Sequence, residues 1–221
     1  MKNFMGKDGF QWFVGVVEDR QDPKHLGRVR VRCLGYHTED MGKLPTSDLP
    51  WAHPMNPITS ATVSGVGQTP LGVVEGTWVV GFFTDTDGQL PMIMGTLPGV
   101  PSTLPVKDAT TGFQDYGNAN YPKYTETDVN RLAVNATDNP HSTLTIRKAD
   151  RDLKVGVTQI DGIFAGVAQI PTDLDITSWD EPITPYNATY PRNHVHESEG
   201  GHIKEIDDTP GAERIHERHA S

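Results

Sequence analysis

The chain is poor in cysteine and lacks long hydrophobic runs. Cys33 is the only cysteine among 221 residues, which excludes an intrachain disulfide and a cysteine-based zinc site. We expect Cys33 to be a small buried apolar residue. No apolar run approaches the roughly 20 residues that span a bilayer, and the first residues lack the apolar stretch of a signal peptide. These absences indicate synthesis in a cytoplasm.

Positive charge is also scarce. The chain carries 19 Lys and Arg residues against 29 Asp and Glu residues, a formal net charge of −10 and a pI near 5.3. Because nonspecific affinity for nucleic acids comes from Lys and Arg, we expect no nucleic-acid partner. Hydrophobic residues make up only 35%, whereas glycines number 22 and prolines 17. This composition favours short strands and irregular connections over helices.

The first half of the chain contains five segments with the features of short strands. In the clearest, residues 27–33, apolar side chains alternate strictly with three arginines, the period-two pattern of a half-buried strand. The others are residues 12–18, 61–67, 76–83 and 92–96. Five short strands bracketed by glycines, without a good helix, predict an all-β fold that begins with a five-stranded barrel of the oligosaccharide- and oligonucleotide-binding (OB) type. We place this domain at residues 1–104.

The remaining residues divide into two parts. In residues 105–182, Thr, Asp, Asn and Gly dominate, and only 143–147 and 163–167 resemble strands. We interpret this part as an extended linker. Residues 183–221 contain a hairpin-like pair of polar strands around a turn at 208–211. Such strands have almost no core of their own, so we expect them to stack on the same strands of other copies.

Two blocks of sequence resemble a known family. Residues 12–20, 22–23, 26–32, 49–51, 57–61 and 65–67 are similar to the OB-fold start of the central baseplate spike of T-even-like contractile-tail phages. Residues 190–191 and 197–214 resemble the entry to that family's triple-stranded β-helix, and the spike of type VI secretion systems has a similar passage.

The resemblance implies a structural protein of the virion tail baseplate. Three chains would form a homotrimer, dock under the baseplate hub protein and puncture the outer membrane of the host, and the family also admits a spike-tip protein as a partner. Residues 183–221 would begin an intertwined trimeric β-helix or β-prism, which continues in family members into a longer needle. No cofactor is expected.

The chain departs from the family between the two blocks. T-even members carry a lysozyme domain there, whereas this interval is too short for one and is broken by Gly and Pro. We therefore expect no enzymatic activity.

The resemblance also implies two sets of interface residues. The hub-facing surface of the barrel would hold Trp12, Arg28, Arg30, Arg32 and Trp51. The trimeric prism would begin with Gly201, His202, Ile203, Glu205, Ile206, Asp207, Asp208, Gly211 and Arg214.

The sequence also contains candidates for a carboxylate site, a metal site and a surface that binds glycans or single strands. Asp207 and Asp208, with Glu205 and Glu213 near, form the densest carboxylate cluster, but adjacent strand residues point to opposite faces. The histidines could hold a metal if symmetry completed the site, although solvated histidines explain the pattern more simply; they are His194, His196, His202, His216 and His219. The alternative to a spike is an OB-fold module that binds glycans or single strands through its arginines.

Overall fold

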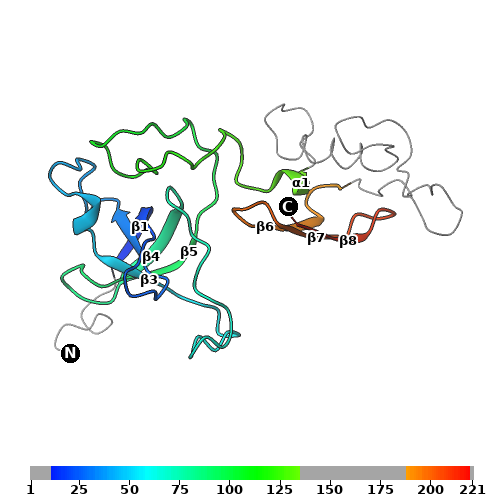
Figure 1. The fold of residues 1–221 in the computed structure, drawn as a ribbon, viewed down its shortest axis with the longest axis horizontal. Coiled ribbons are helices and arrows are strands. Elements are labelled where there is room, and N and C mark those ends of the chain that lie inside the picture. Colours follow the sequence, from blue (N-terminus) through cyan, green and yellow to red (C-terminus); the bar gives the residue numbers. More distant parts are fainter. Residues whose placement is uncertain (1–10, 135–187, 220–221) are drawn as a thin grey trace, which may run out of the picture. The chain divides into compact units, whose positions relative to one another are not determined.

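The computed structural model describes residues 11–134 and 188–219. It divides the chain into two compact units, Met1–Asp128 and Val129–Ser221, which we describe separately (Figure 1). Within the described ranges, no helix has the length and apolar content that crossing a membrane requires. Residues 135–187, which include the strand-like segments 143–147 and 163–167, lie outside the described residues.

The first unit is built on a closed five-stranded barrel, as predicted. The strands are β1 (Trp12–Asp19), β2 (Val29–Cys33), β3 (Trp51–Pro54), β4 (Trp78–Phe83) and β5 (Pro91–Thr96). They pair in the order β1-β2-β3-β5-β4, and only the β3–β5 contact is parallel. This arrangement is consistent with an OB fold.

Alternate residues of the strands fill the interior of the barrel. The buried cluster consists of Phe13, Val17, Val29, Val31, Cys33, Ala52, Val79, Phe83 and Ile93. Cys33 is fully buried, and burial raises the pKa of its thiol to about 12. The interpretation of Cys33 as a small buried residue is confirmed.

One predicted strand was wrong. Residues 61–67 form a loop rather than a strand, and the third barrel strand is β3, which begins at Trp51. Within the loop, Val63 and Val66 form a reciprocal bridge around Ser64 and Gly65, both with positive φ. That backbone makes a tight turn and cannot continue a strand. Pro50 precedes β3 and Pro54 ends it. Because proline is unfavourable within a strand, this segment was not predicted to be one.

A buried ion pair joins the outer side of the barrel to two later segments. Arg32 Nε lies 2.6 Å from Glu18 Oε1, and neither side chain is exposed. Glu18 also accepts hydrogen bonds from Thr46 Oγ1 (2.7 Å) and from the Phe113 backbone N–H (2.7 Å). The backbone of Gly112 lies so close to Arg32 that a Cβ at this position would clash with the guanidinium. Residues 105–128, part of the segment expected to be a linker, belong to this first unit.

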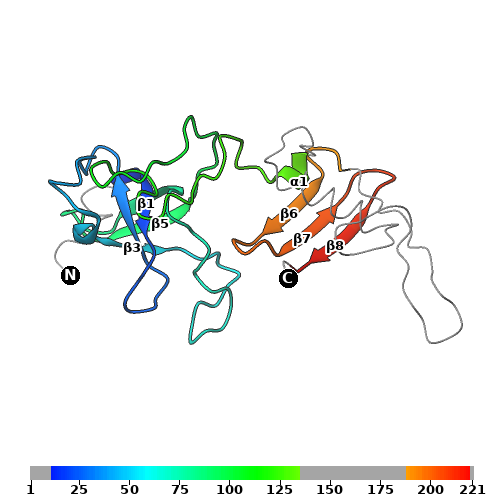
Figure 2. The ribbon, with the colours of Figure 1, turned by 45° about the horizontal axis from the view of Figure 1, so that its top comes forward.

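The second unit contains a three-stranded antiparallel sheet. The helix α1 (Arg131–Val134) precedes β6 (Asn193–Glu197), β7 (Ile203–Asp207) and β8 (Arg214–Arg218) in the described chain, and the strands lie side by side in the order β6-β7-β8 (Figure 2). The predicted pair around the turn at 208–211 corresponds to β7 and β8, in register from Asp207 opposite Arg214. β6 was not predicted from the sequence. The start of a trimeric β-helix and the three domain boundaries remain predictions.

The buried ion pair of the barrel is testable by a charge-neutral change. Replacing Glu18 with glutamine keeps the shape but leaves buried Arg32 without its counter-charge, which costs about 3–5 kcal/mol. We expect E18Q to lower the free energy of unfolding of the first unit by that amount, measured by urea denaturation with tryptophan fluorescence. The exposed pair Lys43–Asp40 supplies the control K43A, expected to change stability by less than about 0.5 kcal/mol. A loss below about 1 kcal/mol in E18Q would contradict the role of this pair.

Candidate functional site

The arginines predicted to face a partner are engaged within their own chain. Arg32 is fully buried against Glu18, so the assignment of Arg32 to an exposed hub face was wrong. The period-two pattern placed Arg32 correctly on the outer side of β2, but residues 38–46 and 112–113 cover that side. The Arg32 guanidinium donates to the backbone oxygens of Thr38 and Leu44 within this cover.

Arg28 and Arg30 are also held by neighbouring groups. Arg28 pairs with Asp22 at 2.6 Å, and both side chains are largely buried. The guanidinium of Arg30 lies 4.5 Å from the ring centroid of Trp51 and donates to the backbone oxygens of Thr46 and Ser47. Trp51 is half-buried beneath the two arginines. These contacts leave little of the stripe available to a phosphate backbone or an acidic partner.

Asp22 organises the loop between β1 and β2. Besides Arg28, the backbone N–H groups of Lys24 and Leu26 donate to its carboxylate. The hydrogen bond from the Arg28 side chain, helped by these backbone donors, outweighs burial and lowers the pKa of Asp22 far below its ordinary value. Arg28 is therefore a structural residue of this loop.

Trp12 belongs to an apolar strip on the outer side of β1 and β4, in which the two tryptophans are exposed and the other residues are partly buried. The strip consists of Trp12, Val14, Trp78, Val80 and Phe82, and the register pairs Trp12 with Phe82 and Val14 with Val80. Trp12 and Trp78 are 52% and 45% exposed. The strip arises because β1 and β4 carry apolar residues on both faces, although only one face lines the core.

The predicted interface residues include Trp12 but not its neighbours in the strip. The signal was present in β4, where all residues but one glycine are apolar instead of alternating with polar ones. A strand with two apolar faces is covered on both sides or exposes one of them. Clusters of exposed aromatic residues typically mark interaction sites.

The predicted prism residues lie on both faces of the second unit's sheet. Ile203, Glu205 and Asp207 point to a buried face, where Arg214 also lies. His202, Ile206 and Asp208 are exposed. Gly201 and Gly211 lie in the turns next to β7, each with positive φ (87° and 77°).

Glu205 is the centre of the buried face. Its carboxylate accepts hydrogen bonds from Asn193 Nδ2 (3.0 Å) and Arg214 Nη2 (2.8 Å), and lies 2.7 Å from His216 Nδ1. Burial by itself would raise the pKa of Glu205, but the hydrogen bonds from Asn193 and His216 and the charge of Arg214 outweigh it and lower the pKa. The apolar core beside this network is small and consists of Leu132, Ala188 and Ile203, with Val195 packed against it.

The opposite face of the sheet exposes apolar side chains. Ile206 of β7 stands directly opposite Ile215 of β8, and Ile215 is 75% exposed. His194 of β6 is the neighbour of Ile206 on the other side. Polar groups are thus buried on one face of this sheet, and isoleucines are exposed on the other.

Comparisons with known proteins agree with this architecture. A family described as Gp5 N-terminal OB domain matches residues 35–170, more than half of the chain. The chain belongs to the Gp5 N-terminal OB domain family. The resemblance to T-even-like spike proteins inferred from the sequence is therefore confirmed.

Two relatives of this Gp5 OB family extend the comparison. The chain is 41% identical over 245 aligned residues to "Protein Gp5" of Vibrio phage KVP40, covering 98% of this chain and 55% of that protein. It is 42% identical over 133 residues to "Pre-baseplate central spike protein Gp5" of Enterobacteria phage T4, covering 58% of this chain and 23% of that protein. The matches thus span about half and about a quarter of these relatives.

The carboxylates and histidines singled out in the sequence can be located in the second unit. Asp207 is buried and Asp208 is exposed on opposite sides of the sheet, so the two carboxylates do not form a pair. Within residues 11–134 and 188–219, no three His, Cys, Asp or Glu side chains cluster closely enough to hold a metal ion. His202 and His219 are in edge-to-face ring contact, and His194 lies 3.8 Å from Asp208.

The Glu205 network predicts a pH-dependent second unit. Because the folded-state pKa of Glu205 is lower than its ordinary value of 4.5, its contribution is present above pH 4.5 and is lost as the pH falls through the folded pKa. We expect hydrogen-exchange protection of β7 and β8, corrected for intrinsic exchange rates, to fall below pH 4.5. E205Q should reduce protection at neutral pH and weaken this acid dependence.

The matched control for E205Q is E217Q. Glu217 pairs with Lys204 on the exposed face, and both side chains are more than half exposed. Its removal should change stability by less than about 0.5 kcal/mol. Equal effects of E205Q and E217Q would contradict a central role for the buried network.

Proposed function

We propose that this chain is a structural component of a phage tail baseplate and forms its central spike. The observation that carries the proposal is the match of the chain, over 98% of its length, to a Gp5 protein, together with the name of the T4 relative, a pre-baseplate central spike protein. The role is mechanical rather than enzymatic. Three copies form the spike, which docks under the baseplate hub and punctures the host envelope when the tail sheath contracts.

The second unit supports assembly from several copies. Its sheet ends at β8, which pairs with β7 on one side and with no described strand on the other. An open strand edge is a template for pairing with another chain. The exposed pair Ile206 and Ile215 adds an apolar face next to that edge. In the proposed prism, neighbouring copies cover both features, and interchain backbone hydrogen bonds stiffen the tip.

The exposed strip of the first unit is the proposed hub-facing surface. It replaces the arginine stripe in that role, because the arginines are engaged by Asp22, Glu18 and backbone oxygens. Trp12 is retained from the predicted set. Because these arginines already bind groups of their own chain, they offer few free donors to a glycan or a single strand. This weakens the alternative of an OB module that binds such ligands.

The native mass tests assembly. The chain has a mass of 24.3 kDa, so light scattering after size exclusion should give three times that value, about 73 kDa. If the gene product is longer than 221 residues, the mass should be three times that of the longer chain. A monomer at every concentration of the longest available product would contradict the trimeric spike.

Docking on the hub is testable at the strip. Tryptophans in interface centres typically contribute at least about 2 kcal/mol, so W78S should weaken binding to the hub protein of the same phage about 30-fold, and W12S should act similarly. Calorimetric titration of the assembled spike with the hub protein measures this. V106S, at an exposed valine outside the strip, is the matched control. Unchanged affinity in both tryptophan variants would place the hub contact elsewhere.

A further inference from the structure

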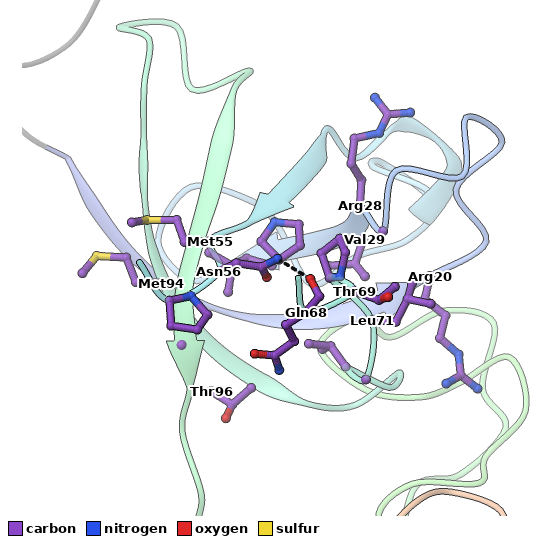
Figure 3. A pocket seen from close by; sticks show the side chains of 18 residues that line it. Arg20, Arg28, Val29, Met55, Asn56, Gln68, Thr69, Leu71, Met94 and Thr96 are labelled. Carbon is purple, nitrogen blue, oxygen red and sulfur yellow. Dashed lines mark hydrogen bonds between the residues drawn. The ribbon is translucent and has the colours of Figure 1, made fainter. Parts of the chain in front are cut away.

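A cavity of about 400 Å³ opens on the first unit beside β5. Its lining combines apolar side chains, among them Val29, Met55, Leu71, Ile93 and Met94, with the uncharged polar side chains of Asn56, Gln68, Thr69 and Thr96. Figure 3 shows Met55 and Met94 side by side, whereas the side chains of the two arginines at the rim extend away from the centre. Both arginines are paired with carboxylates, Arg28 with Asp22 and Arg20 with Glu75. The cavity therefore suits an uncharged occupant that offers an apolar surface to these side chains.

The loop that borders this cavity carries no charge. Between His53 and Glu75, residues 54–74 include no Asp, Glu, Lys, Arg or His, although charged residues make up 22% of the chain. At its tip, Val63 and Val66 are each 63% exposed. Neither valine lines the cavity beside its own loop. An exposed loop that gathers apolar residues at its tip and carries no charge has the features of an interaction site.

The loop has a defined shape. Asn56 Nδ2 donates to Thr62 Oγ1 (3.0 Å) and to the backbone oxygen of Gln68 (2.9 Å), bridging the two sides of the loop. The Gln68 backbone N–H donates to Ser60 Oγ at 2.6 Å. At the tip, the N–H of Val66 donates to the backbone oxygen of Val63 (2.8 Å) across the turn. Because the backbone is already ordered, contact through the tip costs little conformational entropy.

We propose that the tip of this loop, Val63 and Val66, occupies the cavity of the next copy of the chain in the assembly. An apolar projection and an apolar cavity of different position on one chain form a head-to-tail contact, which closes into a ring when the rotation allows it. The net charge of −10 makes copies repel one another, so an uncharged surface is where they approach at lowest cost. This inference rests on the proposed assembly of three copies and names one of its contacts.

Site-specific cross-linking tests the contact directly. Cys33 is buried and its thiol pKa is raised to about 12, so introduced cysteines react selectively. We would co-assemble two differently tagged chains of full length, one with V66C and one with M94C, and add a short bis-maleimide. We expect a covalent dimer that contains both tags. V106C, at an exposed valine outside the loop, replaces V66C in the control and should give little of this product.

The outcomes separate this inference from the proposed function. A trimeric mass without the V66C–M94C product overturns the loop contact but leaves the spike intact. Linkage of V66C only to V66C overturns it too, because the tips would then meet one another. Linkage of V66C to the hub protein instead of a second copy also contradicts it. A monomeric mass throughout contradicts the proposed assembly itself.

A charge at the tip provides an independent measurement. V66D places a carboxylate in the apolar cavity of the neighbour, and we expect at least a tenfold increase in the concentration at which the assembly half-dissociates. V106D adds the same charge elsewhere and should change that concentration less than threefold. Since Val66 is exposed in the single chain, near-ultraviolet circular dichroism should show an intact barrel in both variants. Equal effects of V66D and V106D would overturn the contact.

Discussion

The first unit depends on the buried pair of Arg32 and Glu18. A guanidinium without solvent needs both a counter-charge and oxygen acceptors, and here they come from β1 and from the backbone of residues 38–44. Glu18 in turn binds Thr46 and the backbone of Phe113, which is 95 residues away in sequence. One ion pair therefore attaches two irregular segments to a barrel whose apolar core is small. This explains how a chain rich in glycine and proline forms a defined unit.

The covering of one barrel side determines which side remains open. Residues 112–113 pack over Arg32 and Glu18, whereas Trp12 and Trp78 of the apolar strip are exposed. The first unit also carries the cavity beside β5 and the uncharged loop of residues 54–74. Another protein can bind the strip, the cavity and the loop without removing carboxylates from water, which would be costly in an acidic chain. Their distribution is consistent with a protein that functions inside a larger assembly.

The second unit has its polar and apolar faces arranged differently from a typical small domain. Its buried face is held by hydrogen bonds and charges around Glu205, and Ile206 and Ile215 are exposed. A sheet with little apolar burial contributes little hydrophobic stabilisation by itself. In the proposed spike, contacts with other copies would supply that burial, and the internal network would keep the strands in register until those contacts form.

The sequence by itself determined most of the strands, the barrel class and the family. The sequence located β2 by its alternation, β1, β4 and β5 by short apolar runs, and β7 and β8 by the turn at 208–211. It could not locate β3, whose four residues end at Pro54, or β6. Alternation also cannot show what packs on the outer side of a strand. The tertiary structure decided that Arg32 is buried and Trp12 exposed, because segments distant in sequence cover one side of the barrel and leave the other open.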